Sequence, residues 1–356
     1  MGNKILLYDN GQPFDLDTIY HEPLGGSETS FLLLAKGLSE IDSSNQCVLL
    51  TNKKMSKTST GKIILDNSGF FNDYASQADI IIINRAIPST IDLFKNKKLF
   101  YYAHDAYDQP LIQWMTVKNN LFFFSKIFCV SEWQKYTFNS YFATDNKQMK
   151  VIGNSIDYSM TYGFAQRNHN KLIFAGIPYK GIDYLKPIFD DVCIHSKRDD
   201  LELHVFSSME LYGQNDQDDK YGQYFSDLSR TKNVYLHKPV SMKELIYHLK
   251  TSSIYIAPNL YHETFGINLL LAQACGCLPV TTNKGAVNEI ILNNHTGFIT
   301  QQPNIENNTT YNEYIDLITH VLSKKDDELY KLRLNSINHA KYWNYINVAN
   351  KVMEEL

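Results

Sequence analysis

The chain has 356 residues, of which 44% are hydrophobic and 20% charged, and its formal net charge is −4. This length is large for a single hydrophobic core and predicts two domains of roughly 150 to 180 residues. The charge excludes the basic footprint of a nucleic-acid-binding protein, and no apolar run approaches the roughly 18 to 20 residues of a membrane-spanning helix. The N-terminus lacks the apolar core of a signal peptide, so we expect a cytoplasmic protein.

The first half of the chain alternates apolar runs with helix-competent segments. Such alternation is typical of a parallel sheet in an α/β fold. The predicted strands are Lys4 to Tyr8, Cys47 to Leu50, Ile80 to Ile83, Leu99 to Tyr102 and the run that begins at Lys126.

Two features of this half are candidates for ligand contact. Gly25 and Gly26 precede a helix for which Ser27 is a plausible N-cap, so a phosphate could approach the backbone N–H groups there. His104 follows directly after a predicted strand, where a side chain can reach a ligand. An ordinary turn and a structural histidine remain the alternatives for these features.

The second half begins with a strand at Lys171 to Ala175, followed by a short loop that carries Lys180. The strand Leu201 to Phe206 ends at Ser207. Gln214 to Tyr221 is predicted to be a polar surface loop. Ser241 then caps a helix, because a glutamate follows three residues later.

Residues 254–280 carry the strongest pattern. An apolar strand, Ile254 to Ala257, ends at Pro258, and a polar loop with Glu263 leads to the helix-competent run Ile267 to Ala274. This strand, loop and helix place a carboxylate and the amides of Phe265 and Gly266 at a helix N-terminus. Open α/β sheets bind phosphorylated ligands at such positions.

The ordered motifs resemble one known family. Glu263-Thr-Phe-Gly266 resembles its Glu-x-Phe-Gly donor loop, Gly25-Gly-Ser-Glu28 its Gly-Gly-x-Glu loop, and Gly285 to Glu289 its Gly-Gly-x-x-Glu turn. Tyr-Ala-His104-Asp105 matches the place of a histidine that contacts the donor sugar. The chain is similar over almost its whole length to retaining glycosyltransferases of the GT-B fold, the family 4 type or glycosyl transferases group 1.

The resemblance implies a GT-B fold with two Rossmann-like domains that face each other across a cleft. The first, acceptor-side domain is expected at residues 1–157 and the linker at residues 158–170. The donor domain is expected at residues 171–340, and a C-terminal helix at about residues 341–356 is expected to pack back on the first domain.

The implied activity is transfer of a sugar, with retention, from a nucleotide diphosphate sugar to a hydroxyl acceptor. The resemblance assigns catalytic roles to His104, Glu263 and Lys180. It assigns donor binding to seven further residues, namely Gly25, Gly26, Ser207, Phe265, Gly266, Ile267 and Glu289.

Two positions depart from the family pattern. Ile177 stands where the family usually has an arginine. Leu271 replaces the second glutamate, which in the family accepts hydrogen bonds from the ribose hydroxyls. Glu289 is a candidate substitute acceptor. The departures keep a second hypothesis open, a catalytically silent GT-B protein that binds a glycan or partners an active transferase. A sugar-nucleotide epimerase or a phosphorylase is a third.

No metal or cofactor is expected for the transfer. Asp15-Leu-Asp17 and Asp216-Gln-Asp218 resemble the metal-binding Asp-x-Asp of the other transferase fold, but neither follows the expected strand. The five cysteines lack zinc spacing and are expected to be reduced thiols.

The expected partners are a nucleotide-sugar donor and a glycan, lipid-linked or protein-linked acceptor, with no nucleic acid. Polysaccharide, lipopolysaccharide and glycoprotein glycan assembly are all compatible with these partners. Peripheral contact with a membrane also stays open, although Lys53-Lys54 and Lys95 to Lys98 are too sparse to indicate it.

Overall fold

The computed structural model describes residues 2–163, 165–210, 213, 216 and 220–356. These residues form two compact units. Unit 1 comprises the chain up to Ile19, Leu24–Asp157 and Trp343–Leu356, and unit 2 comprises Tyr20–Pro23 and Tyr158–Tyr342. Each unit contains its own sheet, so the α/β class expected from the sequence is correct.

Unit 1 contains an eight-stranded sheet with the order β3-β4-β2-β1-β5-β6-β7-β8, in which β3 alone pairs antiparallel. Its strands are β1 (Lys4–Asp9), β2 (Gln46–Thr51), β3 (Thr58–Thr60), β4 (Ile63–Asn67), β5 (Ile80–Asn84), β6 (Lys98–Ala103), β7 (Lys126–Cys129) and β8 (Met149–Val151). The central strands are buried on both faces, and their unbroken apolar sequences, such as Ile80 to Ile83, therefore do not alternate with polar residues.

The helices of unit 1 are α2 (Gly26–Ile41), α3 (Phe71–Gln77), α4 (Lys118–Leu121), α5 (Glu132–Phe142) and α13 (Tyr345–Met353), with short 3-10 turns at Ser68–Phe70, Ile91–Phe94 and Pro110–Thr116. The four-residue helix α1 (Thr18–His21) crosses the boundary between the units along the sequence.

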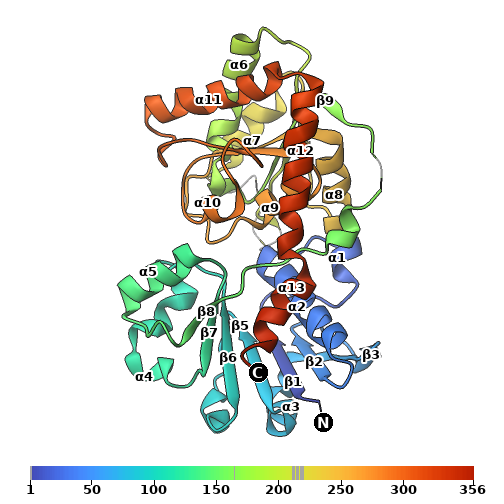
Figure 1. Ribbon diagram of the computed structural model, residues 1–356, viewed down its shortest axis with the longest axis vertical. Helices are drawn as coiled ribbons and strands as arrows, with labels where there is room; N and C mark the ends of the chain where they lie inside the picture. Colours follow the sequence, from blue (N-terminus) through green and yellow to red (C-terminus); the bar gives the residue numbers. More distant parts are fainter. Residues whose placement is uncertain (1, 164, 211–212, 214–215, 217–219) are drawn as a thin grey trace. The chain divides into compact units, whose positions relative to one another are not determined.

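The C-terminal helix α13 packs against α2 within unit 1 (Figure 1). The contact is close because Gly37 of α2 has no side chain: a Cβ there would lie 2.7 Å from the Cβ of Ala349. The last helix of the chain therefore covers the same unit as the first strand.

Unit 2 contains a six-stranded, fully parallel sheet with the order β11-β10-β9-β12-β13-β14. Its strands are β9 (Asn168–Ala175), β10 (Glu202–Phe206), β11 (Val234–His237), β12 (Ser252–Ala257), β13 (Leu278–Thr281) and β14 (Phe298–Ile299). Strand β9 begins at Asn168, three residues before the predicted start of the second domain.

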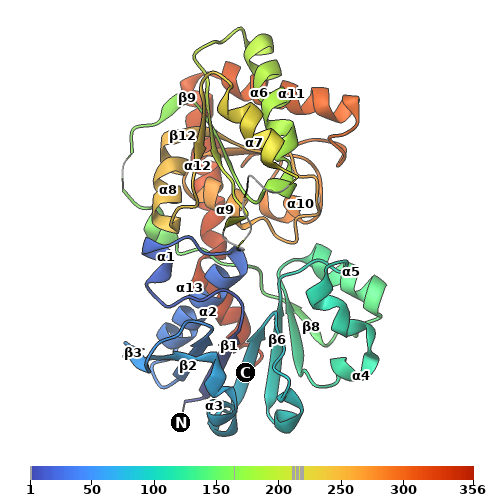
Figure 2. The ribbon, with the colours of Figure 1, turned by 180° about the vertical axis from the view of Figure 1, so that it is seen from behind.

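The helices of unit 2 are α6 (Ile182–Ser196), α7 (Gly222–Ser229), α8 (Met242–Thr251), α9 (Ile267–Ala274), α10 (Val287–Ile290), α11 (Asn308–Ser323) and α12 (Asp326–Ala340), with 3-10 turns at Tyr158–Thr161, Pro178–Lys180 and Lys341–Trp343, the last of which ends in unit 1. Helices α6, α7 and α11 enclose the main apolar core on one face of the sheet, whereas α8, α9 and α12 pack on the other face (Figure 2).

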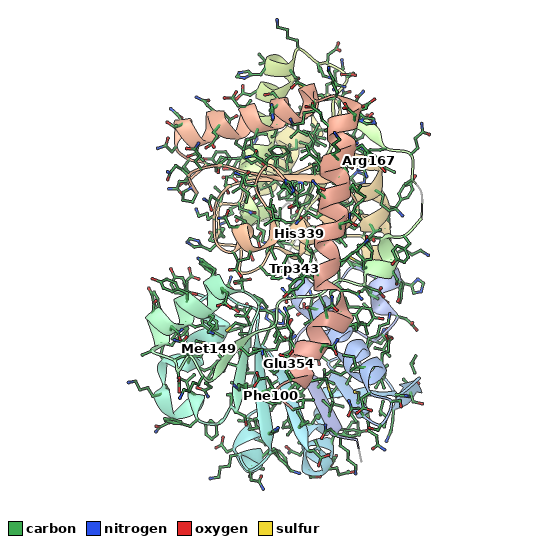
Figure 3. The ribbon with its side chains drawn as sticks, in the orientation of Figure 1. Phe100, Met149, Arg167, His339, Trp343 and Glu354 are labelled. Atoms are coloured by element: carbon green, nitrogen blue, oxygen red, sulfur yellow. The ribbon has the colours of Figure 1, made fainter. Side chains whose placement is uncertain are left out.

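Buried polar contacts connect the elements of unit 2. Arg167, labelled in Figure 3, immediately precedes β9 and donates to the carbonyl of Cys275 after α9 at 2.8 Å. The Tyr314 hydroxyl donates to the Val280 carbonyl of β13 at 2.9 Å and accepts the Ala257 N–H of β12 at 2.8 Å. Tyr314 therefore joins the carboxyl ends of β12 and β13, where the following loops begin.

The five cysteines are unpaired thiols.

Candidate functional site

The loop that carries Glu263 is fixed by its backbone to the loop that follows β13. Glu263 forms a parallel bridge with Gly285, its N–H donates to the Lys284 carbonyl at 3.3 Å, and its carbonyl accepts the Ala286 N–H at 2.7 Å. Gly285 has a φ of +82°, and a Cβ on it would lie 2.3 Å from the Glu263 carbonyl oxygen. A glycine is therefore required at residue 285 for this approach of the two loops.

Lys180 and Glu263, which are 83 residues apart in the sequence, form an ion pair. The Lys180 Nζ lies 2.6 Å from the Glu263 Oε1, with the lysine side chain 32% exposed and the glutamate 10%. Lys180 ends the short turn after β9, and the loop with Glu263 follows β12, the neighbouring strand. The pairing of the two strands thus brings together two of the three predicted catalytic residues.

The start of α9 adds the predicted amide groups to the same region of unit 2. Gly266 is the N-cap of α9 with a φ of +94°, and Phe265 before it is buried. The first N–H groups of a helix have no partner within the helix and point outward with the positive end of its dipole. The N-terminus of α9 and the Lys180 ammonium therefore both favour a negatively charged group here.

Ser207 and Glu289, the other two predicted donor-binding residues of unit 2, lie in different loops. Ser207 directly follows β10, is 6% exposed, and its Oγ has no hydrogen-bond partner among the described residues. Glu289 is in α10, after the Gly285 turn, and its N–H donates to Ala286 at 2.9 Å. Ser207 therefore has an unused hydrogen-bonding group at the carboxyl edge of the sheet.

Leu271 is buried on α9, with 1% of its surface exposed. One turn earlier, the Asn268 amide donates to the Ala175 carbonyl at the end of β9 at 2.9 Å. Asn268 is a polar side chain near the loop after β9 that the motif comparison did not identify. Its place in the first turn of α9, three residues before the departure at Leu271, is the sequence signal that could have found it.

His104 in unit 1 lies beyond the end of β6 and is 9% exposed. Its ring nitrogens are buried. Burial, and next the charge of Arg85, lower the pKa of His104 to about 3, and the Asn154 side chain beside the ring partly offsets this lowering. The ring is therefore neutral near pH 7 and can offer one donor and one acceptor to a ligand.

Gly25 and Gly26 lie at the start of α2, but the cap differs from the predicted one. The helix begins at Gly26 with Gly25 as N-cap, and the Ser27 hydroxyl donates instead to Glu28 at 2.7 Å. A Cβ on Gly25 would lie 2.2 Å from the Glu28 Oε2. A larger residue at position 25 would therefore require the Glu28 side chain, whose carboxylate lies over this turn, to move.

Sequence reasoning missed a charged cluster that surrounds this turn. Arg85 follows β5, and its guanidinium contacts both Asp105 oxygens, at 2.9 and 3.0 Å, and the Glu28 Oε1 at 3.4 Å. Asp9, at the end of β1, accepts hydrogen bonds from Asn84 and from the Gly11 N–H. Arg85 and Asp105 lie just past a strand, Asp9 ends one, and Glu28 follows the glycine turn; these positions are the signal that could have found them.

The backbone and the charges of this cluster are unusual. Arg85 has a φ of +56°, which non-glycine residues seldom adopt, and the Tyr101 hydroxyl holds its carbonyl at 2.8 Å. Burial, and next the Glu28 carboxylate, raise the pKa of Asp9 to about 6. Strained backbone and shifted carboxyl groups occur together at ligand sites more often than elsewhere, which makes the cluster a candidate part of the site.

The aspartate pairs considered for a metal have other surroundings. Asp15 accepts the N–H groups of Asp17 and Thr18 at 3.0 Å each and pairs with Lys53 at 2.5 Å, so it holds the turn before α1. Asp218 lies outside the described residues, as does most of the predicted loop Gln214 to Tyr221.

Within the described part of the chain, no helix is long and apolar enough to cross a membrane.

Comparison with known proteins finds a family similar to the second unit. Residues 167–335 match the model of the family glycosyl transferases group 1. The matched residues cover most of unit 2, which is therefore similar to a glycosyl transferases group 1 domain. The predicted Lys180 and Glu263 both lie within this match.

Two curated relatives are glycosyltransferases. A D-inositol 3-phosphate glycosyltransferase of Arthrobacter sp. is 32% identical over 106 residues, or 30% of this chain and 24% of that protein. An uncharacterized glycosyltransferase of Methanocaldococcus jannaschii is 24% identical over 257 residues, or 68% of this chain. The chain matches less than two thirds of either relative's length, 24% and 65% respectively.

Solved structures with similar folds span the whole chain. A glycosyltransferase from Rickettsia africae has a TM-score of 0.72 and 16% identity, and covers 99% of this chain and 97% of its own. Anabaena HepE in complex with UDP and glucose has a TM-score of 0.69 and 13% identity, with 99% of both chains covered. A sucrose-phosphate synthase of Thermosynechococcus elongatus has a TM-score of 0.71 and 12% identity, with 99% and 98% covered. The fold is GT-B.

Replacement of Gly285 by alanine tests how the Glu263 loop is held. We expect Gly285→Ala to lower the melting temperature and to displace Glu263. A non-glycine residue with this positive φ costs about 1 to 2 kcal/mol, and the added Cβ also clashes with the Glu263 carbonyl. Gly163→Ala is the matched control, since its φ is +94° but its Cβ would meet only the end of Lys250, at 3.6 Å. Equal melting temperatures for the two variants would show that the loops avoid the clash with no loss of stability, which would contradict this expectation.

Proposed function

We propose that the chain transfers a sugar from a nucleotide diphosphate sugar to a hydroxyl acceptor with retention of the anomeric configuration. The observation that carries the proposal is the Lys180–Glu263 pair beside the N-terminus of α9, within the domain that matches the transferase family. The Anabaena structure with UDP and glucose supports the choice of donor class.

The proposed chemistry follows from the charge of the transition state. Positive charge develops on the sugar ring as the bond to the diphosphate breaks, and negative charge develops on the departing diphosphate. A cation and outward-pointing amides placed beforehand at the leaving group stabilise that state because they need no reorganisation. The leaving phosphate can itself accept the proton of the acceptor hydroxyl, so no separate general base is required.

Each residue of the proposed site then has a separate role. The diphosphate is bound by Lys180 and by the amides of Phe265, Gly266 and Ile267. Once the Lys180 ammonium leaves Glu263 for the phosphate, the Glu263 carboxylate accepts hydrogen bonds from the sugar hydroxyls. In unit 1, neutral His104 orients the sugar, and Gly25 and Gly26 offer backbone N–H groups. Ser207 and Glu289 are assigned to the nucleotide. No metal or cofactor takes part in these assignments.

A silent GT-B protein is the second candidate, and a specific observation favours it. Leu271 is buried where an acceptor for the ribose is expected, and Ile177 precedes the turn with Lys180 in place of an arginine. Incubation with UDP-, GDP- and ADP-sugars and a panel of glycan acceptors distinguishes the two. Our proposal predicts a new glycoside whose anomeric proton, observed by NMR, has the donor's configuration, whereas the silent protein yields none.

Removal of either member of the Lys180–Glu263 pair should abolish most transfer. We expect Lys180→Ala and Glu263→Ala each to lower kcat/KM by about 100-fold or more, the usual cost of a lost electrostatic contact to the transition state. Lys186→Ala is the control, because Lys186 forms an equally short ion pair with Asp190 on α6 with both side chains 43% exposed. Circular dichroism should show that all three variants fold. Full activity in the Lys180 or Glu263 variant would refute the site assignment.

Leu271→Glu tests the missing ribose contact. A carboxylate that accepts ribose hydroxyls should tighten nucleotide binding about tenfold, since each charged hydrogen bond contributes roughly 1.5 to 3 kcal/mol. The same change should lower the melting temperature without nucleotide, because it replaces a leucine that is 1% exposed. Calorimetric titration measures the affinity. An unchanged affinity in a folded Leu271→Glu variant contradicts the ribose account, and Leu271→Gln separates the charge from the hydrogen bond.

A further inference from the structure

Three histidines and a lysine gather on the face of the unit 2 sheet that α8 covers. Lys171 pairs in register with Glu202, His204 with Tyr235, and Phe206 with His237, so these side chains of β9, β10 and β11 share one face. Helix α8 contributes His248 to the same face. We name Lys171, His204, His237 and His248 the histidine cluster.

The hydrogen bonds of the cluster require imidazole nitrogens without protons. Lys171 donates to the His248 Nδ1 at 3.2 Å and to the Thr251 Oγ1 at 3.2 Å. The His204 Nδ1 and the His237 Nε2 lie 2.9 Å apart. An ammonium can donate only to a bare ring nitrogen, and two fully protonated rings have no acceptor between them. Protonation of His248, or of both His204 and His237, therefore breaks a contact of the cluster.

The Lys171 ammonium opposes the same protonation. Lys171 is 6% exposed, and no described carboxylate lies within 4.0 Å of its ammonium. Glu202 contacts the far nitrogen of His204 at 3.4 Å and favours a proton on that ring, while Cys277, Tyr235 and Tyr247 are further titratable groups beside the cluster. An added proton on His237 or His248 would thus be placed beside an ammonium that has no close counter-ion.

Burial and this ammonium act in the same direction on all three rings. Burial first, and Lys171 next, lower the pKa of His204 to about 3 and that of His248 to about 4, and they also lower the pKa of His237. The unfolded chain, with histidine pKa values near 6.5, therefore binds more protons than the folded chain between about pH 3 and 6.5. The stability that the cluster provides is complete above about pH 6.5 and is lost as the pH falls.

The cluster lies next to a predicted donor-binding residue. The Phe206 ring stacks on His237 with centroids 4.1 Å apart and an angle of 6°, and it lies 4.7 Å from the His248 ring. Phe206 is the last residue of β10, so Ser207 follows it directly. His237 is likewise the last residue of β11. A shift of these rings therefore moves the ends of two neighbouring strands at the carboxyl edge of the sheet.

We propose that the histidine cluster is a proton-sensitive support for the loop at Ser207. In its neutral state it holds α8 against β10 and β11 and positions Ser207. When it takes up protons, α8 loosens from the sheet and nucleotide binding weakens. Its residues are positioning residues, and the link to nucleotide binding rests on the proposed function, whereas the link to stability does not.

The first experiment measures unfolding by urea between pH 5 and 8 for the wild type and for His204→Asn and His248→Asn, which keep an acceptor but do not titrate. The wild type should lose stability below pH 6.5, and the variants should lose less. His195→Asn and His320→Asn, at exposed positions of α6 and α11, are controls that should follow the wild type. Equal acid sensitivity of all five proteins would overturn the proposal.

The second experiment separates a support that senses protons from a merely structural contact. Lys171→Met removes the ammonium, so the titration of His204 and His248, followed by NMR of the imidazole rings, should move to higher pH. Unmoved titrations would contradict the role of Lys171 even if the variant is less stable. If Lys171→Met does not fold, Lys171→Gln replaces it.

The third experiment measures the affinity for UDP and for GDP at pH 7.5 and pH 4.0 by calorimetry. Because the pKa of His248 is about 4, about half of these rings are protonated at pH 4.0, so the wild type should lose about twofold more affinity on acidification than His248→Asn. This comparison cancels the titration of the phosphate itself. An equal loss in both proteins overturns the link to nucleotide binding. If neither nucleotide binds at either pH, the proposed function fails instead. The unfolding and NMR results then test on their own whether the histidine cluster is a proton-sensitive support.

Discussion

The site of unit 2 depends on the approach of the Glu263 backbone to Gly285. This contact joins the loops after β12 and β13 so closely that a Cβ at residue 285 would overlap the Glu263 carbonyl. Once the backbone is fixed, the Glu263 side chain faces the turn after β9, where Lys180 meets it at 2.6 Å. Without this contact, the loop that carries Glu263 and leads to α9 would not be held against the loop after β13.

The two units contain different kinds of chemistry at the carboxyl ends of their strands. Unit 2 presents an ammonium and a helix N-terminus, which suit a diphosphate. Unit 1 presents a neutral histidine beside three carboxylates, Asp9, Glu28 and Asp105, with Arg85 bound to two of them. Carboxylates accept hydrogen bonds from hydroxyl groups and repel phosphates, so unit 1 is better suited to sugar hydroxyls than to a second phosphate contact at Gly25 and Gly26.

The sequence predicted most of the strands because buried parallel strands are continuous apolar runs. The family resemblance predicted the GT-B fold and assigned roles to Lys180 and Glu263. It did not predict their ion pair, since a contact over 83 residues depends on strand order. The Arg85 cluster and the histidine cluster were missed for the same reason: their members are single polar residues in separate strands and turns, and the sheet register alone unites them.

We propose that unit 2 binds a nucleotide diphosphate through Lys180 without a metal. A thermal-shift panel with UDP, GDP, ADP, CMP and their common sugar conjugates, with and without EDTA, tests it most directly. A ligand that binds the folded state alone at 100 times its Kd stabilises that state by about 2.7 kcal/mol, which raises the melting temperature measurably. We expect a rise with one nucleotide family that EDTA leaves unchanged and that Lys180→Ala reduces. No rise with any nucleotide at millimolar concentration would contradict it and favour a silent GT-B protein, with Leu271 and Ile177 as the explanation.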